Sequence, residues 1–406
     1  MKKRVIALFT GNRAEYGLQF PILTAIDNHP MLEYKLLVSG AHLDANFGNT
    51  LDEINNDGFK IDAEIKIDMG EDSNISTPCA IGTGILAISD VLKKINPDIM
   101  VVYADRFEGF AAVIASTQMN IPTAHIEGGD LTEGGALDDS VRHAMTKLSH
   151  LHFTTNQQAS NRLLAMGEES WRVHTVGFPA IDLISEDCYA TENEVKERLS
   201  LHLDKPIALF TQHSVTTKFE QAGEQIRPSI AAMKKLANDG VQVILTYPNN
   251  DAGGRAIIEL LNQLSKEEHQ NIQVRQSLGR YLYHGVLALA LSDSIKIVCV
   301  GNSSSGIKET PAFGCPTVNI GSRQQGRLRA ENVIDAGYSK DAIYDAVGRC
   351  ITDDKFIKHC KNIENPYYLG GAGVKVANAL SEVELGQTLL RKQMTIKGIV
   401  KNGWYQ

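Results

Sequence analysis

The sequence predicts an α/β fold of two doubly wound domains, each built on a parallel sheet. Short apolar runs rich in Val, Ile and Leu alternate with longer segments of helical period, which is typical of strand-helix-strand units. The alternation occurs in two successive series, and a Gly-Pro step within residues 176–179 separates them and predicts a hinge. A length of 406 residues suits two domains whose cores need no disulfides.

Each series predicts its own elements in chain order. The first predicts strands over residues 5–10, 35–39, 99–103, 123–126 and 151–155, and helices over 16–27, 75–94, 106–118, 139–147 and 157–166. The second predicts strands over 207–211, 241–246, 272–275, 297–300 and 317–320, and helices over 222–238, 253–264, 281–292 and 307–313. A glycine-rich break at 365–371 precedes an amphipathic segment over 373–392. We therefore expect an N-terminal domain (1–178), a C-terminal domain (179–375), a terminal helix returning to the first domain (376–393) and a tail (394–406).

The composition narrows the class of protein. With 40 basic and 48 acidic residues the net charge is -8, and no block of five Lys or Arg residues predicts nucleic-acid binding. No apolar run approaches the roughly 20 residues that a membrane span needs. The six cysteines form no Cys-x-x-Cys pair, and His150 and His152 have no third ligand nearby, so no metal site is predicted. We expect a cytoplasmic protein that forms a homo-oligomer, either a dimer or a tetramer.

Charged side chains follow the strands of the first series, at the edge where open parallel sheets bind ligands. Asp105 and Arg106 come after one predicted strand and Glu127 after the next, and Asp138 begins a helix that also presents Arg142. Acids at helix starts are often only caps, which explains Asp138 but fits Asp105 and Glu127 less well. Carboxylates gathered at one edge can act as acid and base, so these residues are candidate proton-transfer groups.

Two other strand ends carry candidate residues. Gly11 and Arg13 follow the first strand and could hold an anion together with a helix N-terminus. His213 follows the first strand of the second series, where it is either a cleft residue or a structural histidine. The one Gly-x-Gly-x-x pattern, at 82–87, lies in a helical stretch with no strand before it and does not predict a dinucleotide site.

Residues 301–309 have the composition of a phosphate site. They supply glycine, a helix start and the hydroxyls of Ser303, Ser304 and Ser305, without the Lys-Ser/Thr ending of a nucleoside triphosphatase loop or a Gly-x-Ser-x-Gly nucleophile motif. Glu309, one helical turn later, could accept hydrogen bonds from ribose hydroxyls. Arg323 adds a guanidinium further along the chain.

At these residues the chain closely resembles the hydrolysing UDP-N-acetylglucosamine 2-epimerases. The similarity covers nearly all of residues 4–390 and rests on seven stretches in the same order: 10–17, 105–106, 125–129, 138–143, 248–253, 301–306 and 323–327. The resemblance implies the GT-B-type fold of B-type glycosyltransferases, in which two Rossmann-like domains face a cleft. It also implies a UDP-sugar substrate, UDP as product, and no cofactor.

The resemblance assigns roles residue by residue. The essential acids fall on Asp105, Glu127 and Asp138, and the cleft histidine on His213. The expected substrate-binding residues are Arg13, Arg106, Arg142, Ser303, Ser304, Ser305, Glu309 and Arg323. The implied reaction removes the proton on sugar carbon 2 with loss of UDP from carbon 1, and water then adds to the resulting glycal. Which carboxylate is the base and which the acid stays open.

Two features of the sequence bear on the branch of the family and on the sugar. Residues 40–42 read Gly-Ala-His where the non-hydrolysing bacterial branch has glutamine before the histidine, which favours the hydrolysing branch. The loop between Glu127 and Asp138 is longer than in some sialic-acid enzymes. The sugar is therefore either N-acetylglucosamine, giving N-acetylmannosamine for sialic acid, or the 2,4-diacetamido-2,4,6-trideoxyglucose that leads to legionaminic acid, and the nucleotide is either UDP or GDP. A GT-B glycosyltransferase and a non-catalytic UDP-sugar sensor are the rival functions.

Overall fold

The computed structural model describes residues 2–43, 51–67, 75–132, 137–249, 252–267, 269–395, 400–401 and 404–405. The chain divides into two compact units. Unit 1 comprises Met1–Asp130, Asp138–Asp182 and Leu369–Gln406, and unit 2 comprises Leu131–Leu137 and Leu183–Tyr368.

The described residues of unit 1 form a seven-stranded parallel sheet with the strand order β3-β2-β1-β4-β5-β6-β7. This order reverses direction between β1 and β4, as in doubly wound folds. The strands are β1 (Arg4–Thr10), β2 (Leu32–Ser39), β3 (Ile61–Ile65), β4 (Ile99–Tyr103), β5 (Thr123–Ile126), β6 (Leu151–Thr154) and β7 (Val173–Thr175).

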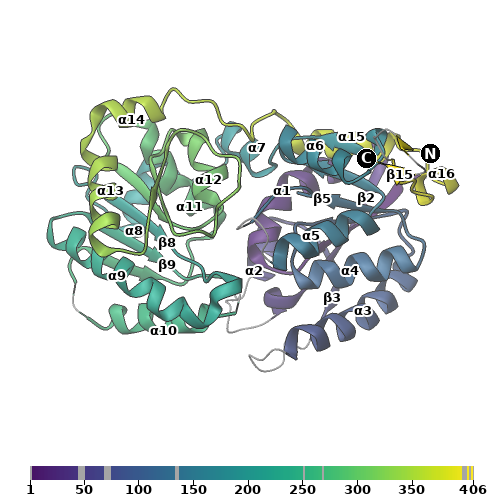
Figure 1. Ribbon diagram of the computed structural model, residues 1–406, viewed down its shortest axis with the longest axis horizontal. Helices are drawn as coiled ribbons and strands as arrows, with labels where there is room; N and C mark the ends of the chain where they lie inside the picture. Colours follow the sequence, from purple (N-terminus) through teal and green to yellow (C-terminus); the bar gives the residue numbers. More distant parts are fainter. Residues whose placement is uncertain are drawn as a thin grey trace. The chain divides into compact units, whose positions relative to one another are not determined.

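Helices connect these strands (Figure 1). They are α1 (Arg13–Asp27), α2 (Leu51–Asn56), α3 (Ser76–Ile95), α4 (Phe107–Gln118), α5 (Leu137–Leu148), α6 (Gln157–Ala165), α15 (Ala372–Glu382) and α16 (Gln387–Leu390), and α7 (Ala180–Ser185) links the two units. On one face of the sheet, α3 and α4 cover a buried cluster that includes Phe9, Met100 and Val102. Such burial of strand and helix side chains is the main source of the unit's stability.

Unit 2 repeats the same architecture with a six-stranded sheet of order β10-β9-β8-β11-β12-β13 in its described residues. Its strands are β8 (Ile207–Thr211), β9 (Gln242–Thr246), β10 (Ile272–Arg275), β11 (Ile297–Gly301), β12 (Thr317–Ile320) and β13 (Val333–Ala336). Its helices are α8 (Glu192–Leu199), α9 (Ala222–Asn238), α10 (Gly254–Ser265), α11 (Gly279–Ala288), α12 (Ser305–Lys308), α13 (Lys340–Thr352) and α14 (Asp354–Cys360). The direction of the order changes between β8 and β11, so both units have the predicted doubly wound fold.

All ten predicted strands are present, but the sequence does not predict five further strands of the described residues. Three of them, β3, β7 and β13, lie at edges of the two large sheets and leave most of their side chains partly exposed. The other two, β14 (Val400–Lys401) and β15 (Trp404–Tyr405), pair with each other. The predicted helix over 307–313 is also wrong in detail, since α12 ends at Lys308 and a 3-10 turn, Thr310–Phe313, follows with Pro311 at its start.

The segment predicted as one long helix over 373–392 is two short helices. Gly386, with φ of 143°, lies between α15 and α16 and takes a backbone conformation that L side chains rarely adopt. α15 packs against α1 in unit 1, and a Cβ at Gly373 would lie 2.4 Å from the Pro21 carbonyl oxygen. Glycine is therefore required at this close approach.

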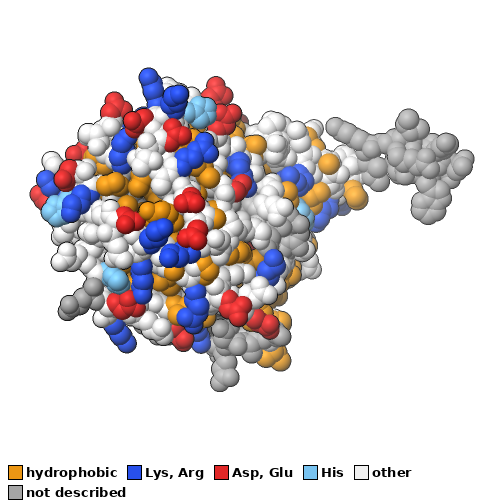
Figure 2. Space-filling model, turned by 60° about the vertical axis from the view of Figure 1, so that its left-hand side comes forward, with side chains coloured by type: hydrophobic (Ala, Val, Ile, Leu, Met, Phe, Trp, Pro, Cys, Tyr) orange, Lys and Arg blue, Asp and Glu red, His pale blue; other side chains and the backbone are white. Residues whose placement is uncertain are grey.

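The described residues include no helix with both the length and the apolar character needed to cross a membrane. Acidic and basic side chains are interspersed on the face drawn in Figure 2, with apolar side chains between them.

Candidate functional site

The carboxyl ends of β4 and β5 place the candidate acids of unit 1 side by side. The two strands pair in parallel, with Tyr103 opposite Ile126, so Asp105 and Glu127 both lie at the same edge of the sheet. Ala104 and Glu127 have positive φ values of 56° and 66°. Left-handed backbone is uncommon for residues other than glycine and is found preferentially at functional sites. It redirects the chain directly after each strand and so aims the acidic residues.

His125 holds the turn at Ala104 through a hydrogen bond. The sequence did not predict this role. Its Nε2 lies 2.6 Å from the Ala104 carbonyl oxygen, and its Nδ1 lies 3.2 Å from the Thr146 hydroxyl. Burial lowers the pKa of His125 to about 3, so the ring is neutral at physiological pH and its Nε2–H donates to the carbonyl. Residues 125–129 belong to one of the stretches that resemble the family, and they include His125. The sequence of a strand does not reveal which distant groups its histidine contacts, so these two partners could not be predicted.

Arg142 connects the acidic residues of unit 1. Its guanidinium donates to the carboxylates of Asp105 and Asp139, at 3.0 Å for the latter, and to the Asp130 carbonyl oxygen at 2.8 Å. Burial disfavours its charge, but Asp105, Glu127 and the other nearby acids outweigh burial and raise its pKa. Arg142 was predicted to bind substrate, and the structure brings it together with Asp105 as a fully buried partner of carboxylates.

Asp138 and Asp139 differ although they are neighbours in the first turn of α5. Asp139 is buried on Arg142, whereas Asp138 is only partly buried. His143, one turn later, has its pKa lowered by burial. Asp138 is therefore the less buried of the two acids at the start of α5.

Arg106 lies on a second buried carboxylate. Its Nε donates to Glu108 Oε2 at 3.2 Å, and the Glu108 side chain is fully buried. Beside it, burial and the neighbouring charge of Glu108 raise the pKa of Glu15 to about 8, so Glu15 is mostly protonated at neutral pH. Sequence analysis did not single out Glu15 or Glu108. The side chain of Arg13 lies outside the described residues, although its backbone begins α1.

In unit 2, Gly301 ends β11 and opens the predicted phosphate stretch. Its φ is 130°, and a Cβ there would lie 1.9 Å from the carbonyl oxygen of Thr211 on β8. Only glycine can occupy this position, so the backbone turns sharply into residues 302–305. Ser303 Oγ accepts from the Ser305 backbone N–H at 3.3 Å. Ser304 is the N-cap residue of α12, and both serines remain partly exposed.

His213 is oriented by two asparagines. Asn302 Oδ1 accepts from the His213 backbone N–H at 2.6 Å, and the Asn249 backbone N–H donates to His213 Nδ1 at 3.1 Å. The same Nδ1 also lies 2.9 Å from Asn249 Oδ1, so both contacts of Asn249 are made to one ring nitrogen. The ring of His213 is thereby fixed at the carboxyl end of β8.

Arg323 lies beside the same turn. Its Nη1 donates to the Asn302 carbonyl oxygen at 3.1 Å, and Gln324 Nε2 donates to the same oxygen at 2.8 Å. Arg327 binds the returning segment of unit 2, donating to the Leu131 carbonyl oxygen at 2.7 Å. The structure thus brings His213, Arg323 and the 301–305 turn together around Asn302.

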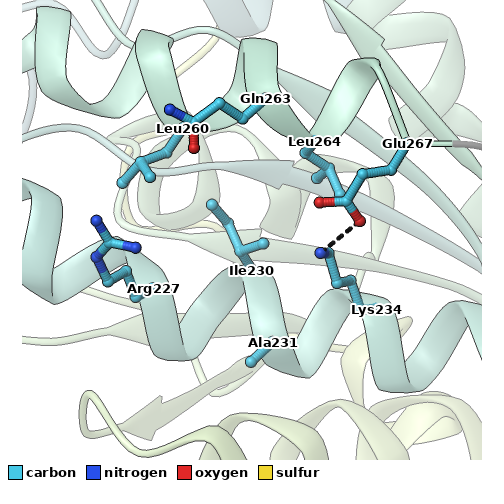
Figure 3. A pocket seen from close by; sticks show the side chains of 8 residues that line it. All are labelled: Arg227, Ile230, Ala231, Lys234, Leu260, Gln263, Leu264 and Glu267. Carbon is cyan, nitrogen blue, oxygen red and sulfur yellow. Dashed lines mark hydrogen bonds and ion pairs between the residues drawn. The ribbon is translucent and has the colours of Figure 1, made fainter.

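A groove elsewhere on unit 2 lacks these groups. Figure 3 shows its lining side chains, which come mainly from α9 and α10 and include the Lys234–Glu267 ion pair at 2.6 Å. None of the predicted site residues lines it. Within the described ranges, no three His, Cys, Asp or Glu side chains gather as metal ligands would. His150 and His152 are buried, and His152 Nε2 lies 2.9 Å from Glu168 Oε2.

Solved structures share this fold. The UDP-GlcNAc 2-epimerase from Neisseria meningitidis bound to UDP-GlcNAc matches with a TM-score of 0.75 at 21% identity, covering 93% of this chain and 99% of that one. The Methanocaldococcus jannaschii UDP-GlcNAc 2-epimerase in complex with UDP-GlcNAc and UDP matches with a TM-score of 0.72 at 18% identity, covering 93% and 99%.

Sequence relatives are closer. The chain is 34% identical over 389 residues to the UDP-N,N'-diacetylbacillosamine 2-epimerase (hydrolyzing) of Legionella pneumophila, covering 96% of this chain and 98% of the relative. It is 33% identical over 357 residues to the UDP-N-acetylglucosamine 2-epimerase of Neisseria meningitidis serogroup B, covering 87% and 89%. The family model described as UDP-N-acetylglucosamine 2-epimerase matches residues 24–381. With this match and these strand-end residues, the chain belongs to the UDP-N-acetylglucosamine 2-epimerase family.

Proposed function

We propose that the protein is a hydrolysing UDP-sugar 2-epimerase, which converts UDP-N-acetylglucosamine or a close 2-acetamido analogue and water into the free 2-epimeric sugar and UDP. The observation that carries the proposal is the placement of Asp105 and Glu127 at the ends of two neighbouring strands. Asp105 follows the left-handed residue Ala104, and Glu127 is itself left-handed. The buried Arg142 donates a hydrogen bond to Asp105 beside them. Such a set can transfer protons without a metal or a nicotinamide.

The reaction has two steps. In the first, a carboxylate removes the proton on carbon 2 while the bond from carbon 1 to the diphosphate breaks, giving a glycal and UDP. In the second, water adds its hydroxyl to carbon 1, and a proton is delivered to carbon 2 on the face opposite to the one that lost it. We assign proton transfer at carbon 2 to Asp105 or Asp138, and positioning or water activation to Glu127.

The departing diphosphate requires positive or donor groups. In unit 2, the turn around Asn302 offers the hydroxyls of Ser303 and Ser304, the Arg323 guanidinium and the ring of His213. Donors held in place before the reaction stabilise a leaving anion without the cost of reorientation. We infer that UDP binds here and that His213 donates to a phosphate oxygen.

A second substrate is favoured by the names of two relatives. The Legionella pneumophila enzyme and a Campylobacter jejuni enzyme, also 34% identical, are diacetylbacillosamine 2-epimerases (hydrolyzing), the latter for GDP or UDP. Diacetylbacillosamine is the 2,4-diacetamido-2,4,6-trideoxy sugar. This substrate and UDP-N-acetylglucosamine are therefore the two to compare. A cytoplasmic location and a homo-oligomeric state stay predictions.

One experiment tests the proposal. The protein is incubated with UDP-N-acetylglucosamine, UDP-diacetylbacillosamine or GDP-diacetylbacillosamine, and the products are identified by proton and phosphorus NMR. We expect free sugar with the inverted carbon 2 and nucleoside diphosphate in equal amounts. A nucleotide-linked epimer would instead indicate the non-hydrolysing reaction. Transfer to an added sugar acceptor would indicate a glycosyltransferase, and binding without turnover would indicate a sensor.

A further inference from the structure

The chain passes from unit 1 to unit 2 shortly after Glu127. Asp130 is the last residue of unit 1 at this point and Leu131 the first of unit 2, so the crossing, Asp130–Leu131, begins three positions after Glu127. Asp130 is held in unit 1, since it accepts from Asn156 Nδ2 at 3.0 Å and from Arg142 Nη1 at 2.8 Å. The short turn 127–130 therefore has little slack, and the place of Leu131 bears directly on that of Glu127.

Arg327 holds the unit 2 side of the crossing. Its Nε donates to the Leu131 carbonyl oxygen at 2.7 Å, and its Nη2 donates to the Thr132 hydroxyl at 3.0 Å. Thr132 is only 5% exposed. Because the guanidinium is planar and rigid, two donors that bind neighbouring residues fix the orientation of the segment as well as its position.

The same guanidinium also reaches the turn around Asn302. Arg327 Nη1 donates to Gln324 Oε1 at 2.9 Å, and Nε2 of the fully buried Gln324 donates to the Asn302 carbonyl oxygen at 2.8 Å. Asn302 in turn accepts from the His213 backbone N–H at 2.6 Å. A continuous series of hydrogen bonds thus connects Leu131 to the residues that we propose bind UDP.

We propose that Arg327 is a positioning residue, which ties the crossing to the turn around Asn302 and thereby sets the place of Glu127 for the reaction. The inference rests on the proposed function, because it takes that turn as the UDP site and Glu127 as a group that positions or activates water. Arg327 acts through the chain and through Gln324, and it touches no reacting atom.

The test measures kcat of the full-length protein with the UDP-sugar that wild type turns over, and UDP affinity by calorimetry. Arg327→Met keeps the apolar stem and removes all three donors. We expect kcat to fall about tenfold or more, since misplacing a reacting group by about 1 Å can cost about a hundredfold. UDP affinity should stay within about threefold of wild type, because Arg323 and Gln324 still donate to Asn302. Arg327→Lys should restore only part of kcat.

The products give a second measurement, one that a general loss of structure would not change in the same way. A misplaced Glu127 slows the addition of water to the glycal, so more of this intermediate escapes. We expect the share of free glycal among the sugar products, measured by proton NMR, to rise at least fivefold in Arg327→Met. An unchanged share would contradict the proposed action through Glu127.

Thr132 supplies an independent pair of variants. Thr132→Val keeps the shape of the side chain but loses the hydroxyl that accepts from Arg327, so kcat should fall about threefold or more. Thr132→Ser keeps the hydroxyl and should stay within about twofold of wild type. The double variant with Arg327→Met should be no more than about twofold slower than Arg327→Met alone, since residues that act through one contact are not additive.

The matched control is Arg275→Met, because Arg275 is an exposed arginine of unit 2 that also donates to a glutamine, Gln273, at 3.1 Å. It should keep the wild-type kcat. Wild-type kcat in Arg327→Met would overturn the inference, as would a loss of UDP affinity as large as the loss of kcat; either result leaves the proposed function standing. If wild type releases no free sugar and UDP, the proposed function itself fails. Should Arg327→Met not fold by circular dichroism, the comparison of Thr132→Val with Thr132→Ser decides.

Discussion

The guanidinium of Arg142 donates a hydrogen bond to the carboxylate of Asp105, 37 positions away in the chain. The pair joins the middle of α5 to the turn that follows β4, and Arg142 also holds Asp139 on its own helix. A candidate base that is ion-paired in this way keeps one orientation. We propose that Arg142 also acts on the reaction through Asp105.

Removing the candidate acids should strongly lower turnover without removing nucleotide binding. We expect Asp105→Asn, Glu127→Gln and Asp138→Asn each to lower kcat by about a hundredfold or more, because general acid-base groups contribute about that much. Affinity for UDP, measured by calorimetry, should change little. Asp341→Asn, at the exposed start of α13, is the control. Near wild-type kcat in all three variants would refute the acid-base assignment.

Arg142 should be needed for stability as well as for activity. Arg142→Gln leaves Asp105 and Asp139 as carboxylates without their buried cation, and breaking one side of a buried pair costs roughly 3–5 kcal/mol. Urea unfolding followed by circular dichroism measures the loss. Arg255→Gln, an exposed arginine of unit 2, should cost under about 0.5 kcal/mol. Equal stability of the two variants would contradict the role of Arg142.

The sequence predicts the buried part of the fold better than its edges. Val101 and Val102 lie in a continuous apolar run that is buried on both faces, so β4 is predicted with its observed bounds. The edge strand Ile61–Ile65 alternates apolar and acidic residues over only five positions, and that pattern is weak.

The same distinction applies to the candidate site. Strand ends indicate where Asp105 and Glu127 lie in unit 1, because the carboxyl ends of parallel strands share one edge of their sheet. The same rule indicates the place of His213 at the sheet edge of unit 2. Pairings between distant elements, such as His284 with Glu309, depend on packing that local periodicity does not encode. The protonation of Glu15 likewise follows from burial beside Glu108, which becomes known only once the fold is assembled.

UDP affinity should depend on the turn around Asn302. We expect Ser303→Ala and Ser304→Ala each to weaken UDP binding about threefold to tenfold, and Arg323→Ala about tenfold or more, since bonds to a charged partner are the stronger ones. Calorimetry with UDP measures this directly. Ser339→Ala, which removes a hydroxyl that caps α13, is the control. Unchanged affinity in all three would place the diphosphate elsewhere.

Acid should destabilise unit 1 through three histidines. Burial lowers the pKa of His125 to about 3 and the pKa values of His150 and His152 to about 4, below the usual 6.5. Their contribution to stability is complete above pH 6.5, where neither state is protonated. Below pH 6.5 these histidines bind protons in the unfolded chain but not in the folded chain. The free energy of unfolding therefore falls as the pH drops towards 4, by about 1.4 kcal/mol per pH unit for each such proton.

Unfolding free energies from urea titrations between pH 7.5 and 4.5 measure this slope. His152→Gln should reduce the slope, because one of the three groups is removed. His269→Gln, a substitution of a partly exposed histidine in unit 2, is the control and should leave the slope as in wild type. An unfolding free energy that does not change over this pH range would contradict the prediction.

The last prediction concerns Arg172, which holds the C-terminal segment on unit 1. Its fully buried guanidinium donates to the carbonyl oxygens of Thr388 and Leu389 at 2.9 and 2.7 Å, and Lys392 reaches the buried Glu168 at 2.7 Å. Arg172→Met keeps the apolar stem but leaves these carbonyls without their donor, at a cost of about 1–3 kcal/mol for each buried group. We therefore expect residues 387–395 to exchange amide hydrogens at least tenfold faster, while α3 keeps its wild-type rates.

Arg198→Met, at an arginine 57% exposed on α8, is the matched control and should change neither segment. Faster exchange in α3 as well would mean that Arg172 supports the whole unit, and unchanged exchange at 387–395 would mean that the segment is held by its apolar contacts, such as that of the buried Leu389, instead.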